Sequence, residues 1–128
     1  MRTAYSQGRD MSPGLVHLYV QLTIGAAGAV TRVRGFGLSD ATPPVRNSAG
    51  NYTITLDQRY GGAFVGFTGA MKQATGVAAL IPRRISGNGN DNEAIVIETS
   101  VAAGTVTDPA SGDEMYLCFV IDENGLVP

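Results

Sequence analysis

The sequence predicts an all-β fold, a single-domain β-sandwich or small barrel of about seven to eight short antiparallel strands. Two observations carry this prediction. Glycine occurs 17 times and proline six times along the 128 residues, and both disfavour helix interiors. Val, Ile, Thr, Tyr and Phe gather in short runs with a period of two, which is typical of strands. We expect residues 14–128 to form this domain and polar residues 1–13 to form an extended N-terminal arm.

The first half of the chain contains three predicted strands. In residues 15–24, apolar residues alternate with His17, Tyr19, Gln21 and Thr23, which indicates one dry and one wetter face. Residues 25–28 make a tight connection to a strand over 29–37, so the two form a hairpin. Residues 39–50 are predicted to be a loop because they contain Pro43 and Pro44. Residues 51–57 form a strand with Tyr52, Ile54 and Leu56 on one face.

The second half adds the remaining strands. Residues 63–71 and 115–121 are apolar on both faces, so both are predicted to be central and covered. Residues 77–81 form a strand that ends at Pro82, and 94–101 form another. Residues 104–107 are expected to form a short edge strand, and residues 108–113 a turn. Asp113 in this turn and Asp57 at a strand end are expected to cap backbone N–H groups.

Composition and charge exclude several classes of function. The net charge of −2 argues against a nucleic-acid-binding protein, which needs many Lys and Arg residues to neutralise phosphates. No apolar run approaches the length of a membrane helix, and the N-terminus does not resemble a signal peptide. The single cysteine, Cys118, allows no disulfide within the chain, and its apolar surroundings predict a buried, inert thiol.

No residue pattern predicts catalysis, a metal or a cofactor. Nucleophilic catalysis needs a base beside the nucleophile. The only histidine, His17, lies on the wetter face of a predicted strand, and the only cysteine is predicted to be buried. The carboxylates form no recognisable motif, and the Asn/Asp-rich residues 88–93 lack the spacing of a calcium loop. No glycine pair belongs to a phosphate-binding motif. A small hydrolase is the least favoured interpretation, and we expect a protein that is not an enzyme.

A pair of arginines stands out as a candidate interface. Arg32 and Arg34 are two residues apart on a predicted strand, so both side chains point to one face. This basic stripe either meets carboxylates of a neighbouring subunit or is simply solvated.

Three segments resemble small virion proteins of tailed phages: GAVTRVRGFGL, GNYTITLDQRYGGAFVGFTGAM and VTDPASGDEMYLCFVI. The resemblance covers residues 29–121 and consists of a rhythm of short strands. It implies a capsid decoration or cement protein on the virion surface that binds the major capsid protein, often as a homotrimer, and it brings no catalytic residues. The arm would then add a strand to a neighbour's sheet edge, with Arg2, Tyr5 and Arg9 as contact residues; the alternative is a disordered arm.

The alternative function is a receptor- or carbohydrate-binding module of a phage fibre or head spike. Such a module would need an exposed platform of aromatic side chains. The chain has no tryptophan and only five tyrosines and four phenylalanines, several of them in predicted core strands, which argues against a platform.

Overall fold

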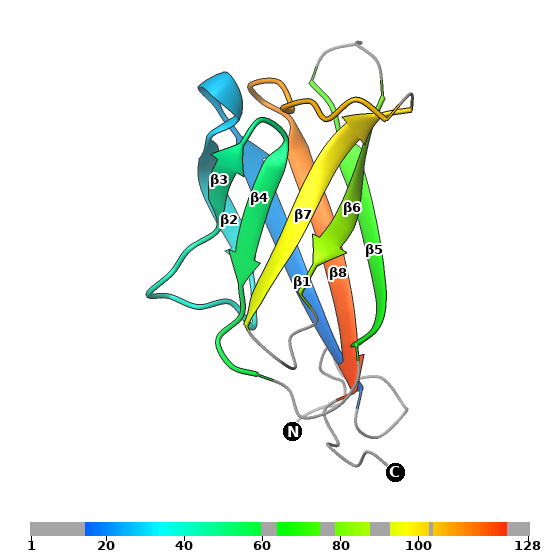
Figure 1. Cartoon of the computed structure of the whole chain (residues 1–128). Helices are drawn as coiled ribbons and strands as arrows, with labels where there is room; N and C mark the ends of the chain where they lie inside the picture. Colours follow the sequence, from blue (N-terminus) through cyan, green and yellow to red (C-terminus); the bar gives the residue numbers. More distant parts are fainter. Residues whose placement is uncertain (1–14, 60–63, 75–78, 88–92, 103, 123–128) are drawn as a thin grey trace.

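The fold is a sandwich of two four-stranded antiparallel sheets, seen in a computed structural model that describes residues 15–59, 64–74, 79–87, 93–102 and 104–122 (Figure 1). One sheet has the order β2-β1-β8-β5 and the other β3-β4-β7-β6. The strands are β1 (Leu15–Ile24), β2 (Val30–Gly35), β3 (Val45–Ser48), β4 (Asn51–Thr55), β5 (Phe64–Lys72), β6 (Leu80–Ser86), β7 (Ala94–Val101) and β8 (Glu114–Asp122). The all-β prediction is confirmed, and the sandwich is selected over the barrel. The predicted arm, with Arg2, Tyr5 and Arg9, lies outside the described residues.

The core lies between the sheets and follows from the alternation of apolar residues. Every second residue of β1, β4, β7 and β8 is buried, and these side chains meet across the sandwich. The buried apolar set is Leu18, Val20, Leu22, Ile24, Tyr52, Ile54, Leu56, Ile95, Ile97, Met115, Leu117, Phe119 and Ile121. Each side chain of this size stabilises the fold by about 1.5–3 kcal/mol when it leaves water. The predicted inward faces of residues 15–24 and 51–57 are therefore confirmed.

Three predicted elements were wrong. Residues 39–50 are not all loop, because Val45–Ser48 form β3, a short exposed strand at the edge of the second sheet. The strand near residue 80 does not end at Pro82 but continues to Ser86; β6 is an edge strand, where a missing backbone donor is tolerated. Instead of a short strand over 104–107, the described residues of this segment form an isolated bridge between Val106 and Ser100.

The position of β5 also differs from the prediction. β5 lies at the edge of its sheet, and its exposed side chains include Val65, which is 56% exposed. Its apolar character comes partly from glycines, and at Gly69 an added Cβ would lie 2.8 Å from Pro82 of the other sheet. β8, the second strand predicted to be central, does lie between β1 and β5.

Asp108 joins the turns at one end of the sandwich. Its carboxylate accepts hydrogen bonds from Arg46 Nε at 3.0 Å and Nη2 at 2.7 Å, and from the Gly50 backbone N–H at 2.7 Å. The carboxylate also lies where a Cβ at Gly28 would be, and Gly28 has a φ of +77°. The Gly28 carbonyl accepts the hydroxyl of buried Tyr52 at 2.7 Å, so Asp108, the β1–β2 connection and the core are linked.

The Asp108 contacts predict how stability depends on pH. The hydrogen bond from Arg46 holds the pKa of Asp108 below its ordinary value, with a further contribution from the Gly50 N–H. A carboxylate whose pKa is lower in the folded state stabilises that state above its unfolded pKa, and this contribution is lost as the pH falls through the folded pKa. We expect Asp108→Asn to flatten the fall in unfolding free energy as the pH drops below about 4. Urea titrations at several pH values measure this, and an unchanged slope would contradict it.

Candidate binding face

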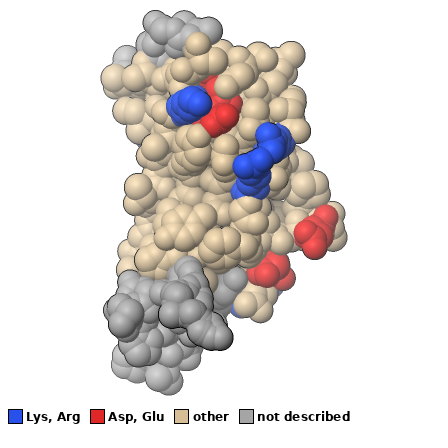
Figure 2. Space-filling model, turned by 180° about the vertical axis from the view of Figure 1, so that it is seen from behind, with Lys and Arg blue, Asp and Glu red and all other residues tan. Residues whose placement is uncertain are grey.

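The outer surface of the β2-β1-β8-β5 sheet carries the side chains that alternate with the core residues. On β1 these are His17, Tyr19 and Gln21, because Leu18, Val20 and Leu22 point inward. On β8 they include Tyr116 and Cys118, for the same reason. Figure 2 shows the molecule from behind, the side on which this sheet lies in Figure 1; most of the visible surface carries no charge, and charged side chains form small groups.

Four side chains form an aromatic patch on this face: His17, Tyr19, Phe36 and Tyr116. The ring centroids of Tyr19 and Phe36 are 5.7 Å apart, and those of His17 and Tyr19 are 6.2 Å apart. Tyr116 lies diagonally across from Tyr19, because Tyr19 pairs with Cys118 two residues along β8. Tyr19, Phe36 and Tyr116 are 45%, 49% and 39% exposed, respectively. Large aromatic side chains are thus exposed to solvent on one face of the sheet.

Gly35 places Phe36 in this patch. Its φ is +144°, and a Cβ there would lie 2.1 Å from the carbonyl oxygen of Tyr19. Only glycine fits this close approach without a shift of the backbone. The next residue, Phe36, donates its backbone N–H to the same Tyr19 oxygen at 3.3 Å, so its ring lies next to that of Tyr19.

Polar groups on two strands orient Tyr116. Glu114 accepts hydrogen bonds from the Tyr116 hydroxyl and, at 3.4 Å, from Gln21 Nε2. The bond to Glu114 is the main reason that the pKa of Tyr116 is raised. Because its hydroxyl is held, the ring loses less conformational freedom when a partner covers it.

Arg32 and Arg34 lie at the β2 margin of the same face. Arg32 pairs with Thr23 and Arg34 with Gln21 in the register of β1 and β2, so both point outward as expected. Both residues are exposed. Arg34 and three rings of the aromatic patch border a shallow hollow of about 300 Å³, which also reaches Gln21, Gly35 and Leu117. The three rings are those of Tyr19, Phe36 and Tyr116.

Two other candidate residues have structural positions. Asp113 caps backbone N–H groups as predicted: its carboxylate accepts from Ala74 N at 2.7 Å and from Ala110 N at 2.9 Å. Cys118 was expected to be buried but is only half-buried, because it points away from the core between buried Leu117 and Phe119. Partial burial raises the pKa of its thiol, which lowers the thiolate fraction available for reaction.

The arrangement suits binding. Exposed rings provide apolar contact area, and Gln21, Glu114 and Arg34 provide hydrogen-bonding groups beside them. In the described part of the chain, no three His, Cys, Asp or Glu side chains gather closely enough to hold a metal ion. The described residues also include no helix with the length and apolarity needed to cross a membrane. Residues 88–92, most of the calcium-like segment, lie outside the described residues.

Comparisons with other proteins name no family. No protein-family model, no curated protein and no solved structure matches the chain. The patch was not predicted from the sequence: Tyr116 was expected in a strand covered on both faces, and nothing was predicted for the Phe36 ring. The signal available was the alternation in residues 15–24, which put His17 and Tyr19 on the wetter face.

Proposed function

We propose that this chain is a structural protein of a phage virion that binds the outer surface of the capsid, and that it docks through the aromatic patch. The exposure of Tyr19, Phe36 and Tyr116 on one sheet face is the observation that carries the proposal. Tyrosine is enriched at the energetic centres of protein interfaces, and charged residues are depleted there. The resemblance to decoration proteins supports the capsid as the partner.

The docking geometry suits a repeated lattice. A sheet face presents its side chains on strands that are fixed by neighbours on both sides, as β1 and β8 are here. Such a surface needs little rearrangement when it binds. We propose that the partner is the major capsid protein and that the chain binds as a homo-oligomer, with a trimer favoured by the resemblance. An oligomer that binds through several copies at once would hold the capsid more tightly than a single copy, through avidity.

Truncation of the patch is expected to weaken binding strongly. Tyr19→Ser removes the ring that contacts both His17 and Phe36, while its backbone stays in the centre of the β1 strand. Loss of such an anchor costs about 2 kcal/mol or more, roughly a thirtyfold loss of affinity. Co-sedimentation with phage particles that lack the endogenous protein, over a range of concentrations, measures this affinity.

Ile81→Ser is the matched control for Tyr19→Ser. Ile81 lies on β6 of the other sheet and is 52% exposed, so the control removes an apolar side chain that is similarly accessible. It should leave the affinity within about twofold of the unaltered chain. Equal losses for the two variants, or no loss for Tyr19→Ser, would refute docking through the aromatic patch.

Glycan binding is the second candidate, and the hollow beside the patch favours it. Pockets for small ligands combine apolar and aromatic walls with a few convergent polar groups, and the hollow of about 300 Å³ joins three rings to Gln21 and Arg34. The small number of aromatic residues argued against this function from the sequence, but three of them are exposed together on one sheet face. A glycan array separates the two candidates: binding at better than millimolar affinity, lost in Tyr19→Ser, would favour a receptor-binding module over a decoration protein.

A further inference from the structure

The two long margins of the sandwich differ. At one margin, β5 and β6 pack against each other across the sheets, and the Leu80 backbone N–H donates to Gln73 Oε1 at 3.1 Å. At the other margin, β2 and β3 make no comparable contact within the described residues. Residues 36–44 connect β2 to β3 at this margin (Figure 1).

β2 is the edge strand of its sheet at this margin. Among the described residues it pairs only with β1, and five of its six residues, Thr31 to Gly35, are exposed. It contains no proline, whereas the edge strand β6 contains Pro82. An edge of this kind has backbone N–H and C=O groups that can pair with an added strand.

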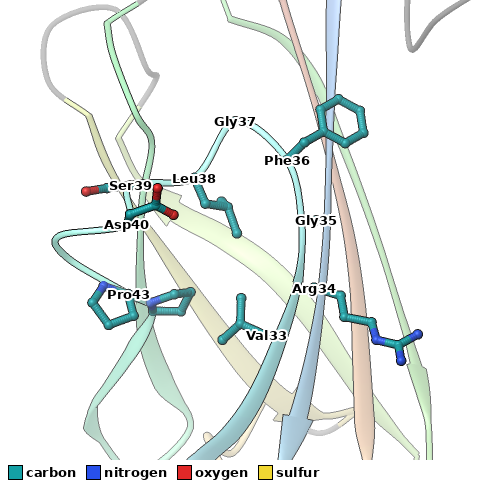
Figure 3. A pocket seen from close by; sticks show the side chains of 10 residues that line it. Val33, Arg34, Gly35, Phe36, Gly37, Leu38, Ser39, Asp40 and Pro43 are labelled. Atoms are coloured by element: carbon teal, nitrogen blue, oxygen red, sulfur yellow. The ribbon is translucent and has the colours of Figure 1, made fainter.

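A groove runs beside this edge on the inner side of β2. It has a volume of about 420 Å³, and its walls combine apolar Val33, Leu38, Pro43 and Pro44 with polar Ser39 and Asp40. Figure 3 shows Val33 pointing toward Leu38 and Pro43, while Arg34 points to the opposite side of the strand. A strand added to β2 would therefore meet apolar side chains on its inner face.

Arginines line the outer side of the same edge. Arg46, Arg59 and Arg83 each form an ion pair with a carboxylate, at 2.7, 4.0 and 3.0 Å. Arg32 and Arg34 form no ion pair with the carboxylates of the described residues. A partner that brings carboxylates to this side would compensate two exposed charges.

We infer that the β2 edge binds an extended segment of the partner protein, in which apolar residues alternate with Asp or Glu. The segment adds a strand to the sheet through main-chain hydrogen bonds, which give affinity, and its alternating side chains give specificity. The apolar residues enter the groove beside Val33 and Leu38, and the carboxylates meet Arg32 and Arg34. This inference rests on the proposed protein-binding function and names the segment that the face recognises.

The charge of the chain's own N-terminal arm does not fit this edge. Residues 1–13 contain Arg2 and Arg9 but only one carboxylate, Asp10. Placed beside Arg32 and Arg34, the arm would add positive charge to an already basic stripe, and like charges on adjacent strands are destabilising. The predicted exchange of the arm with a neighbour's sheet edge is therefore not proposed for β2, and the partner segment belongs to another protein.

Hydrogen exchange tests the inference directly. The full chain is compared free and bound to phage particles that lack the endogenous protein, with exchange read peptide by peptide. We expect the amides of residues 30–35 that point away from β1 to exchange at least tenfold more slowly in the bound chain, because an added strand gives them acceptors. Arg32→Gln with Arg34→Gln should weaken binding about tenfold and reduce its salt dependence, whereas Lys72→Gln on β5 should do neither.

The outcomes separate this inference from the function on which it rests. If the unaltered chain does not bind particles, the proposed function fails. If it binds but residues 30–35 exchange as in the free chain, β2 is not paired and the inference fails while the function stands. If β2 is protected but the double arginine variant binds as tightly as the Lys72→Gln control, the prediction that the partner segment is acidic is wrong. Thermal unfolding of each variant checks that the exposed substitutions leave the fold intact.

Discussion

Replacement of Phe119 by alanine is expected to lower the free energy of unfolding by about 3–5 kcal/mol. Phe119 is fully buried at the centre of β8, and its ring lies 5.5 Å from that of Phe67 and 6.5 Å from that of Phe64. The substitution removes apolar contacts to both β5 rings and leaves a cavity that the two sheets can fill only partly. A loss of this size is a large share of the total stability of a small domain, which is about 5–15 kcal/mol.

Urea unfolding of Phe119→Ala and Val120→Ala measures the effect against a neighbouring residue. Val120 is only partly buried and points to the outer face of β8, so its truncation should cost roughly 1 kcal/mol or less. Similar losses for the two variants would show that β8 does not have the inward and outward faces described here. The aromatic patch would then lose its structural basis, because Tyr116 depends on the same alternation.

Asp113→Ala is expected to cost about 2–5 kcal/mol, because it leaves two backbone N–H groups without their acceptors. The Asp113 carboxylate is fully buried and accepts from Ala74 after β5 and from Ala110 in the turn before β8. Both hydrogen bonds are partly buried, and a hydrogen bond to a charged group contributes about 1.5–3 kcal/mol. The backbone carbonyl of Asp113 also accepts from Ile24 N at 2.9 Å, so the end of β1 would be affected.

Two further variants test whether this cost comes from the lost acceptors. Asp113→Asn keeps one side-chain oxygen and should lie between the unaltered chain and Asp113→Ala in unfolding free energy. Asp40→Ala removes an exposed carboxylate from the loop beside β2 and should change stability by no more than about 0.5 kcal/mol. A loss for Asp113→Ala as small as that for Asp40→Ala would contradict the capping role.

The alternation of residue types predicted the centre of the fold but not its margins. β1, β4 and β7 are recognisable because one face of each strand is buried, and burial on one face imposes a period of two. β3 has no such face: all four of its residues, Val45 to Ser48, are exposed, so nothing in its side chains distinguishes it from a loop. β5 was misplaced because small and apolar residues on an edge strand resemble those of a covered strand.

The candidate site was predicted less completely than the fold. The direction of Arg32 and Arg34 followed from their spacing, since a strand sends residues two apart to one face. The aromatic patch did not follow, because it combines residues from β1, β8 and the turn after β2, and their proximity depends on strand order. Sequence periodicity indicates which face a side chain joins but not which strand lies beside it. Phe36 depends in addition on the backbone conformation of Gly35.

The most direct test of the central claim is the copy number of this chain in purified phage particles, measured by quantitative mass spectrometry. A protein that decorates the capsid through the aromatic patch should be present at a copy number close to that of the major capsid protein, because each lattice position offers an equivalent site. Absence from particles, or only a few copies per particle, would contradict capsid decoration; a few copies would instead fit a fibre or spike and favour the glycan-binding function.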